Sequence, residues 1–451
     1  MVKSHAEESL GANPGDAALN PADSVAMGVQ AARAPRMLER ARWRAFRALR
    51  NPSFRLLFSA FLVNQTGFWI SHVSLQGLMA SLSSNDATQQ GRLFFAMFIP
   101  AFVLAPLAGV AADHFDRKRI VLACYAGVVF VTSGLAATTY AGLATPSLLQ
   151  LFGFSLGVCF SFSGPASMAL AANAVPEEDL SSAVSLQSTA NNLTRVAGPA
   201  FAAPLLASGR FEIAFGAFTI AAFVAALLTS RMQPRPYEPE AEDGGIFARL
   251  KSGLDHARER HPAMPALITV AWVSLFGVSH VALTPIYAAE VLGDSGWFAW
   301  IVVCTGIGAM AGALTSGYQK DLPTLRGSAL RALAFGLMLI GFALSRTPTA
   351  ALLMQVLVGY FYFAIMTDLQ RLIQEIVDEA RRGRVMSLFQ VAWGGLVPFG
   401  GLGMGLLAAE FGTPVTIGVG GALCGLYGAV LAVVAPRLGS EPGGEGGSPK
   451  G

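Results

Sequence analysis

Apolar residues of this chain gather into twelve runs that are separated by short polar stretches. The first six runs cover residues 56–80, 93–112, 120–140, 147–172, 184–207 and 212–230, and the second six cover 264–289, 297–317, 328–345, 349–370, 385–408 and 414–435. Each run has about 20 residues, which as a helix is enough to cross the ~30 Å hydrocarbon core of a bilayer. The pattern predicts an all-α membrane protein with twelve transmembrane helices.

A polar segment from Arg231 to His261 divides the runs into two sets of six, with prolines and glycines early and a helical pattern from Phe247 to Arg260 late. We therefore predict five parts along the chain. They are a cytosolic tail (1–50), a six-helix bundle (51–231), a cytosolic central loop (232–262), a second six-helix bundle (263–436) and a second cytosolic tail (437–451).

Two short sequence echoes relate the two sets of helices. Ser71-His72-Val73 recurs as Ser279-His280-Val281, 208 residues later, and the stretch 174–186 parallels the stretch 375–388 at an interval of 202 residues. Both echoes fall at the same place in each six-helix set. Internal duplication is common among transporters, so we predict two pseudo-symmetric bundles.

Composition supports a polytopic membrane protein. Hydrophobic residues make up 53% of the chain, charged residues only 13%, and the mean hydropathy is +0.52, far from a soluble globular composition. The net charge of +3 is too small to indicate a nucleic-acid partner. The four cysteines stand singly in apolar runs, so neither a metal site nor a disulfide framework is expected.

The distribution of Lys and Arg predicts the orientation in the membrane. If the N-terminus is cytosolic, the outside loops keep only Arg92, Arg210 and Arg346, and the remaining loop cations lie inside. This bias places both termini in the cytosol, with the chain in the cytoplasmic membrane. Arginines from Arg33 to Arg50 alternate with apolar residues, which fits a basic amphipathic helix on an anionic leaflet or a plain positive flank.

A tight charged corner, Gly109 to Arg119, lies between the second and third runs. It resembles the G-x-x-x-D-x-x-x-R-K signature of major facilitator transporters. Four other stretches, Asn51–Arg55, Gly67–Trp69, Asn192–Pro199 and Gly383–Ser387, resemble the branch of enterobactin exporters and macrolide efflux proteins, called transmembrane secretion effectors. The chain departs from that branch at Phe68, where an acidic residue is common, and the second copy of the corner, Gly312 to Lys320, has lost its Asp and Arg-Lys.

The resemblance implies a conformational latch between the two bundles. Its predicted members are Gly109, Asp113, Arg117, Lys118 and Arg384. If the Asp113 carboxylate meets the start of the eleventh helix near Arg384, the contact would stabilise a state closed on the cytosolic side. The competing interpretation is simple anchoring of the loop.

Three ionisable residues inside the apolar runs are the main candidates for proton coupling. Arg195 lies near mid-bilayer in the fifth run, where a charge costs ~2.5 to 3.5 kcal/mol, so it must face protein or water. It is a candidate for binding an anionic substrate, and equally for fixing the bundle. His72 and His280 occupy matching positions in the first and seventh runs, and histidine titrates near neutral pH. The alternative is that they are hydrogen-bonded packing groups.

Other polar, aromatic and helix-bending residues complete the predicted site. The candidate substrate cavity comprises Asn64, Gln65, Trp69, Gln76, Ser161, Ser163, Trp272, Gln355 and Tyr360. Gly198, Pro199 and Pro398 are candidate hinges, with static packing kinks as the alternative. We expect Asp368, Arg371, Glu375, Asp378 and Glu379 to form solvated salt bridges at the cytosolic end of the tenth helix.

These features favour a monomeric secondary active exporter that moves a small amphiphilic compound, siderophore-like or drug-like, outward against proton entry. Proton-coupled uptake is the first alternative, and a non-transporting membrane sensor is an alternative of another class. No P-loop and no catalytic motif is present, so an enzyme is not predicted. No cofactor or metal is expected, and the predicted partners are a small-molecule substrate, protons and the lipid bilayer.

Overall fold

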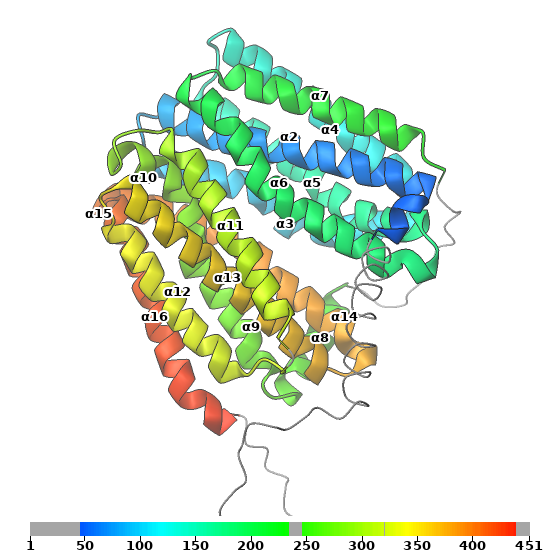
Figure 1. Cartoon of the computed structure of the whole chain (residues 1–451), viewed down its shortest axis with the longest axis vertical. Coiled ribbons are helices and arrows are strands. Elements are labelled where there is room, and N and C mark those ends of the chain that lie inside the picture. Colours follow the sequence, from blue (N-terminus) through cyan, green and yellow to red (C-terminus); the bar gives the residue numbers. More distant parts are fainter. Residues whose placement is uncertain (1–45, 234–245, 320, 439–451) are drawn as a thin grey trace, which may run out of the picture.

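A computed structural model describes residues 46–233, 246–319 and 321–438, and these residues form helices and no strand (Figure 1). After a short turn, η1 (Arg47–Arg50), the first half consists of α2 (Pro52–Leu82), α3 (Ala87–His114), α4 (Arg117–Tyr140), α5 (Pro146–Ala174), η2 (Glu177–Asp179), α6 (Leu180–Ala207) and α7 (Phe211–Ser230). The linker helix α8 (Ile246–Glu259) leads into the second half.

In the second half, two of the membrane helices are interrupted. The seventh consists of α9 (Ala263–Trp272), η3 (Val273–Gly277), η4 (Val278–Leu283) and α10 (Thr284–Glu290), and the eleventh of α14 (Glu379–Gln390), η5 (Val391–Gly395) and α15 (Val397–Phe411). The others are α11 (Trp297–Gly317), α12 (Leu325–Leu344), α13 (Pro348–Ile376) and α16 (Thr413–Leu438). All twelve predicted runs therefore lie on helices, and the predicted fold class is confirmed.

Within the described residues, nine helices are long and apolar enough to cross a membrane by length and composition alone. The helices α2, α3 and α6 fall outside that group. The polar side chains of α2 and α6, such as Asn64, Gln65, Asn191 and Arg195, lower the hydropathy of these two helices. Polar membrane helices of this kind are expected where a bundle lines an internal site.

Polar caps define where several helices begin. Thr145 and Thr347 each accept a hydrogen bond from the backbone three residues on, and each is followed by a proline in the first helical turn. Proline is favoured there because the first N–H groups of a helix have no partner within the helix. The two Thr-Pro starts are 202 residues apart (347 − 145), so α5 and α13 repeat one another.

The two halves meet through a pair of symmetric contacts. Helix α3 packs on α15, and α6 packs on α11. In the order of membrane helices these are the second on the eleventh and the fifth on the eighth. Exchanging the two halves converts one contact into the other, which is what a pseudo-twofold relation requires.

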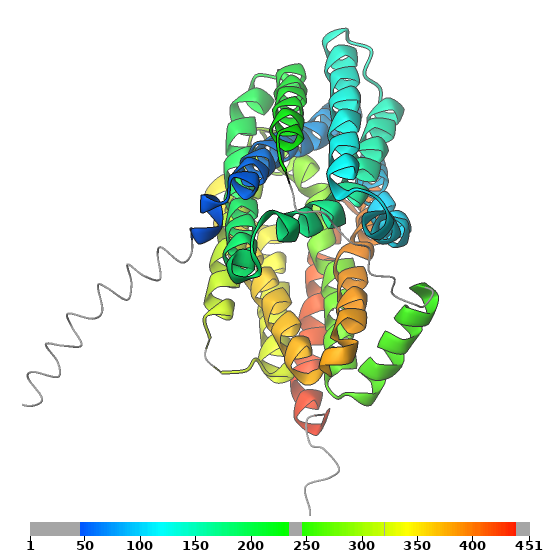
Figure 2. The same ribbon diagram turned by 90° about the vertical axis from the view of Figure 1, so that its right-hand side faces the viewer.

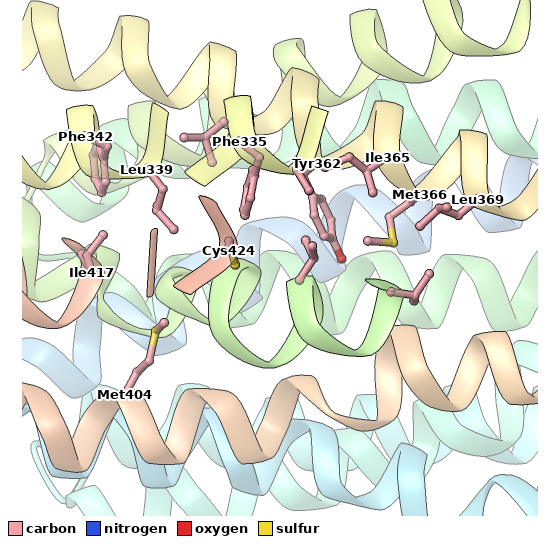
Figure 3. Close-up of a cluster of buried hydrophobic side chains, with 14 of the residues drawn as sticks. Phe335, Leu339, Phe342, Tyr362, Ile365, Met366, Leu369, Met404, Ile417 and Cys424 are labelled. Carbon is pink, nitrogen blue, oxygen red and sulfur yellow. The ribbon is translucent and has the colours of Figure 1, made fainter. Parts of the chain in front are cut away.

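The halves are joined on one side of the molecule and separate on the other. We call the side of η1, the 115–116 turn and α8 the linker side, and the side of the 83–86 and 412 turns the opposite side. Figure 3 shows the main core of the second half, where Phe335 and Leu339 of α12 lie near Cys424 of α16, and this core also includes Ala87 and Leu206 of the first half. By contrast, the first-half core around Phe54 and Tyr125 on the linker side has no described second-half member.

Candidate functional site

Arg195 lies at the junction of the two halves, near the middle of α6. Its guanidinium carbon is 5.6 Å from the ring centre of Trp69 on α2 and 4.5 Å from that of Phe363 on α13. The cation is therefore held between one aromatic ring from each half. Such cation–π contacts stabilise a desolvated cation by ~2 kcal/mol.

No carboxylate pairs with Arg195 among the described residues, and its buried Nε atom has no hydrogen-bond partner there. The buried indole N–H of Trp69 is also unpartnered. An unpaired buried donor is costly, so such atoms need a water or ligand acceptor. Nearby, the Gln65 amide donates to Asn191 at 3.1 Å, so the predicted residues Gln65 and Trp69 both border this centre.

Small residues hold α6 in this position. A Cβ atom at Gly198 would collide with Trp69, and a Cβ atom at Gly306 of α11 would lie 3.3 Å from the carbonyl oxygen of Arg195. These glycines let α2 and α11 approach α6 closely from two sides. Helix α6 runs without interruption through Gly198 and Pro199, and both residues are buried.

The aromatic wall continues to the interrupted eleventh helix. Trp393, in the π-helical turn η5, donates its indole N–H to the hydroxyl of Tyr362 at 2.6 Å. Tyr362 precedes Phe363, which stacks on Arg195. Neither Phe363 nor Trp393 was among the predicted cavity residues, because sequence alone does not tell which face of α13 or of the η5 turn points inward.

His72 is buried among aromatic rings in the first half. Its Nε2 atom is 3.0 Å from the Gln76 amide nitrogen, its ring stacks on Phe68, and its Nδ1 atom has no partner among the described residues. With Ser71, whose buried hydroxyl is also unpartnered, it lines an apolar cavity of about 170 Å³. One ring nitrogen of His72 is thus left for water or a proton-exchanging group.

His280, the counterpart in the second half, is fully hydrogen-bonded. Its Nδ1 atom is 2.8 Å from the carbonyl oxygen of Gly277, which only accepts, so the proton resides on Nδ1. Nε2 then accepts from the amide of Gln355 at 3.2 Å, and the Gln355 oxygen accepts from Thr305 at 3.1 Å. The structure brings the two predicted residues His280 and Gln355 together, in a neutral and satisfied network.

The remaining predicted cavity residues contact their own bundles. Trp272 donates to the carbonyl of Leu423, and Tyr360 bonds to Thr315. Ser161 and Ser163 donate to carbonyls of their own helix, and Asn64 is buried with an unpartnered Oδ1. None of these five side chains contacts Arg195 among the described interactions.

Three of the predicted latch residues, Arg117, Lys118 and Arg384, have the following contacts among the described residues. Arg117 donates to Asn173 at 3.0 Å and Lys118 to the carbonyl of Met232 at 2.7 Å, both within the first half. Arg384 donates instead to Ser252 of α8 at 2.8 Å, and a Cβ atom at Gly109 would meet nothing within 4 Å. The side chain of Asp113 lies outside what the structure describes, as does the amphipathic segment before residue 46.

One expectation about the charged residues was wrong. Asp368 is only 1% exposed, where a solvated salt bridge was expected. It forms an ion pair with Arg331 of α12 and accepts a hydrogen bond from Ser316 of α11. It is buried because α11, α12 and α13 close around it, which no local sequence pattern reveals.

No cluster of three metal-ligating side chains occurs in the described part of the chain. A family model described as transmembrane secretion effector matches residues 44–441. The chain is 25% identical over 370 residues to the staphyloferrin A transporter of Staphylococcus aureus, covering 81% of this chain and 92% of that protein.

Two solved structures show the same fold. The POT family transporter PepTSo superposes with a TM-score of 0.69 at 15% identity, covering 86% of this chain and 98% of that one. A bacterial homologue of the lysosomal transporter Spinster, inward-facing and unoccupied, gives a TM-score of 0.61 at 15% identity and covers 89% and 99%.

Proposed function

Because the chain belongs to the transmembrane secretion effector family of major facilitator transporters, which are multi-pass membrane carriers and not enzymes, we propose that it exports a small amphiphilic anion in exchange for protons. Siderophore-like and drug-like compounds fit this class. The proposed site lies between the two halves, and alternating access moves the compound across the bilayer.

The observation that carries this proposal is the unpaired guanidinium of Arg195 between Trp69 and Phe363. A cation at this depth must be compensated, and an anionic group on the substrate supplies that compensation. The flanking rings offer apolar faces to the rest of the molecule. Since the rings come from different halves, a bound compound would touch both halves at once.

The direction of loading follows from two arguments. The bias of Lys and Arg supports a cytosolic position for the linker side. The contacts between the halves lie on the opposite side, where Gly405 packs on Ala87 and Gly401 packs on Phe94. In this conformation a compound would therefore reach Arg195 from the linker side, which is the side from which the proposed exporter loads its substrate.

The test uses purified protein in proteoliposomes with an imposed ΔpH and a panel of amphiphilic anions. We expect accumulation driven by the proton gradient for at least one anion. Arg195→Ala should weaken its apparent affinity by about ten- to hundred-fold, since hydrogen bonds to charged groups contribute ~1.5–3 kcal/mol. The apparent affinity of the Arg195→Lys variant should lie between those of the unaltered protein and Arg195→Ala, because lysine keeps the charge and loses the planar stacking.

Arg326→Ala is the matched control, since Arg326 is an exposed cation at the start of α12. Equal affinities of the Arg195→Ala variant and the unaltered protein would contradict the assignment of Arg195. Transport that runs only toward the cytosol would favour uptake, the alternative function.

His72 is the better candidate for the proton site, because one of its nitrogens has no partner in the described part of the chain, while both nitrogens of His280 are bonded. We expect His72→Gln, which keeps polarity and cannot titrate at neutral pH, to reduce ΔpH-driven accumulation several-fold. His280→Gln is the matched control and should retain coupling. Normal coupling in the double variant would eliminate both histidines as proton carriers.

A further inference from the structure

The eleventh membrane helix is interrupted near its middle, and we call this interruption the joint. A π-helical turn, η5 (Val391–Gly395), separates α14 from α15, and Pro398 lies in the first turn of α15. Gly394 and Gly395 belong to this turn, and proline removes a backbone donor from the next turn. π-helical turns and prolines are recognised sites of helix bending.

The two arms of this helix are held by different parts of the molecule. On the opposite side, α15 packs on α3 so closely that a Cβ atom at Gly405 would lie 2.6 Å from the carbonyl oxygen of Ala87. On the linker side, α14 packs on the linker helix α8, at the edge of the molecule (Figure 2). Helix α15 is therefore packed against the first half, whereas α14 is packed against the linker helix α8.

The α8–α14 contact is close and polar. A Cβ atom at Gly253 of α8 would lie 2.9 Å from the carbonyl oxygen of Arg384, so only glycine allows this approach. The guanidinium of Arg384 donates to Ser252 at 2.8 Å. This occupies the arginine that the sequence predicts as a partner for the 109–119 corner.

An ionic cluster fixes the start of α14. Arg260, just after α8, donates to both carboxylate oxygens of Asp378 at 2.8 and 2.9 Å. His256 is 2% exposed, with Asp378 3.5 Å from its Nε2, and Arg381 lies 3.1 Å from its Nδ1 and 3.8 Å from Glu259. The hydrogen bonds from Arg260 lower the pKa of Asp378 from its ordinary value, so this carboxylate stays charged.

The joint also contacts the proposed substrate site. Trp393 lies within η5 and bonds to Tyr362, whose neighbour Phe363 stacks on Arg195. Arg195 is therefore connected to the joint through Phe363, its neighbour Tyr362 and Trp393.

We propose that α8 is an intramolecular clamp that holds α14 away from the first half and keeps the linker side open. This inference rests on the proposed alternating-access function. Closing the linker side then requires α14 to swing about η5, and Arg384 to exchange Ser252 for the 109–119 corner. A broken clamp should raise the population of the closed state.

The test measures closure without any substrate, so its failure is distinguishable from failure of the transport proposal. Cysteines are introduced at Phe115, 66% exposed on the α3–α4 turn, and at Gly383 of α14, where an added Cβ atom would meet nothing within 4 Å. The four native cysteines are replaced by alanine. The rate of intramolecular cross-linking by a bis-maleimide in nanodiscs then reports how often α14 reaches the first half.

We expect Arg260→Gln and Ser252→Ala each to speed this cross-linking, by about five-fold for Arg260→Gln, in line with a half-exposed ion pair. Arg258→Gln is the matched control, since Arg258 pairs only with Asp255 of the same helix among the described ion pairs. Ser252→Ala removes a single hydroxyl and keeps the helix intact. Cross-linking rates equal to the control, or slower, in both clamp variants would overturn the proposal.

Discussion

Arg195 and Asp368 are both charged residues on membrane helices, but their charges are compensated differently. Arg195 has aromatic neighbours and no acidic partner among the described residues, whereas Asp368 is bound by both Arg331 and Ser316. Ser316 stands 203 residues after Asp113 (316 − 113), at the place of the missing aspartate in the second copy of the corner. In the second half, the carboxylate therefore comes from α13 instead of the corner itself.

Removing this carboxylate should destabilise the second half. We expect Asp368→Asn to lower the free energy of unfolding by about 3 kcal/mol, the low end for a broken buried pair because Arg331 keeps 24% exposure. The double variant Arg331→Gln and Asp368→Asn should lose less free energy of unfolding than Asp368→Asn alone, since no uncompensated charge remains. Denaturant unfolding in detergent measures both, and a single variant as stable as the double would contradict the ion pair.

At the scale of elements, glycines determine where helices touch across the two halves. Gly91 of α3 and Gly405 of α15 face each other, and a Cβ atom at Gly91 would lie 3.0 Å from Gly405 Cα. Gly403 is two residues from Gly405 on the same helix, and a Cβ atom there would meet nothing within 4 Å. The two positions make a matched pair for testing closure of the opposite side.

Gly405→Leu should force α3 and α15 apart and open the opposite side. We expect a cysteine at Ala80, 5% exposed in the cavity of about 530 Å³ on that side, to react about ten-fold faster with a membrane-impermeant thiol reagent. Gly403→Leu should leave the reaction rate unchanged. Similar rates in both variants would show that the glycine contact does not seal this side.

Hydrophobic run length predicted all twelve helices, and periodicity predicted α8, because both depend on local sequence. The interruptions at η3 and η5 were not predicted, although Pro398 was a candidate hinge beside the second. The sequence predicts Arg195 and Trp69 as candidate site residues but not Phe363, since the contact of Phe363 with Arg195 depends on how α13 is rotated against α6. The burial of Asp368 was missed for the same reason, because it depends on three helices at once.

At the scale of the whole molecule, the two halves are joined mainly by two equivalent helix pairs. The α3–α15 and α6–α11 pairs are equivalent under exchange of the halves, and the shared core on the opposite side includes Ala202 and Leu206 of α6. The linker-side core of the first half has no described member from the second. Relative rotation about the joined side is the motion that this division of contacts permits.

The unpaired guanidinium of Arg195 has an electrical consequence. Without a bound anion, Arg195 would hold one positive charge within the membrane field, and the proposed monovalent anion would cancel that charge. Moving one charge through 100 mV changes the energy by ~2.3 kcal/mol, so voltage should act on the proton-loaded return step more than on the anion-loaded step. We expect the rate of efflux from vesicles clamped with potassium and valinomycin to depend on voltage, and Arg195→Gln to weaken that dependence. Voltage-independent efflux by the unaltered protein would argue against an uncompensated charge at Arg195. If efflux depends on voltage, the membrane potential directly determines the rate of turnover.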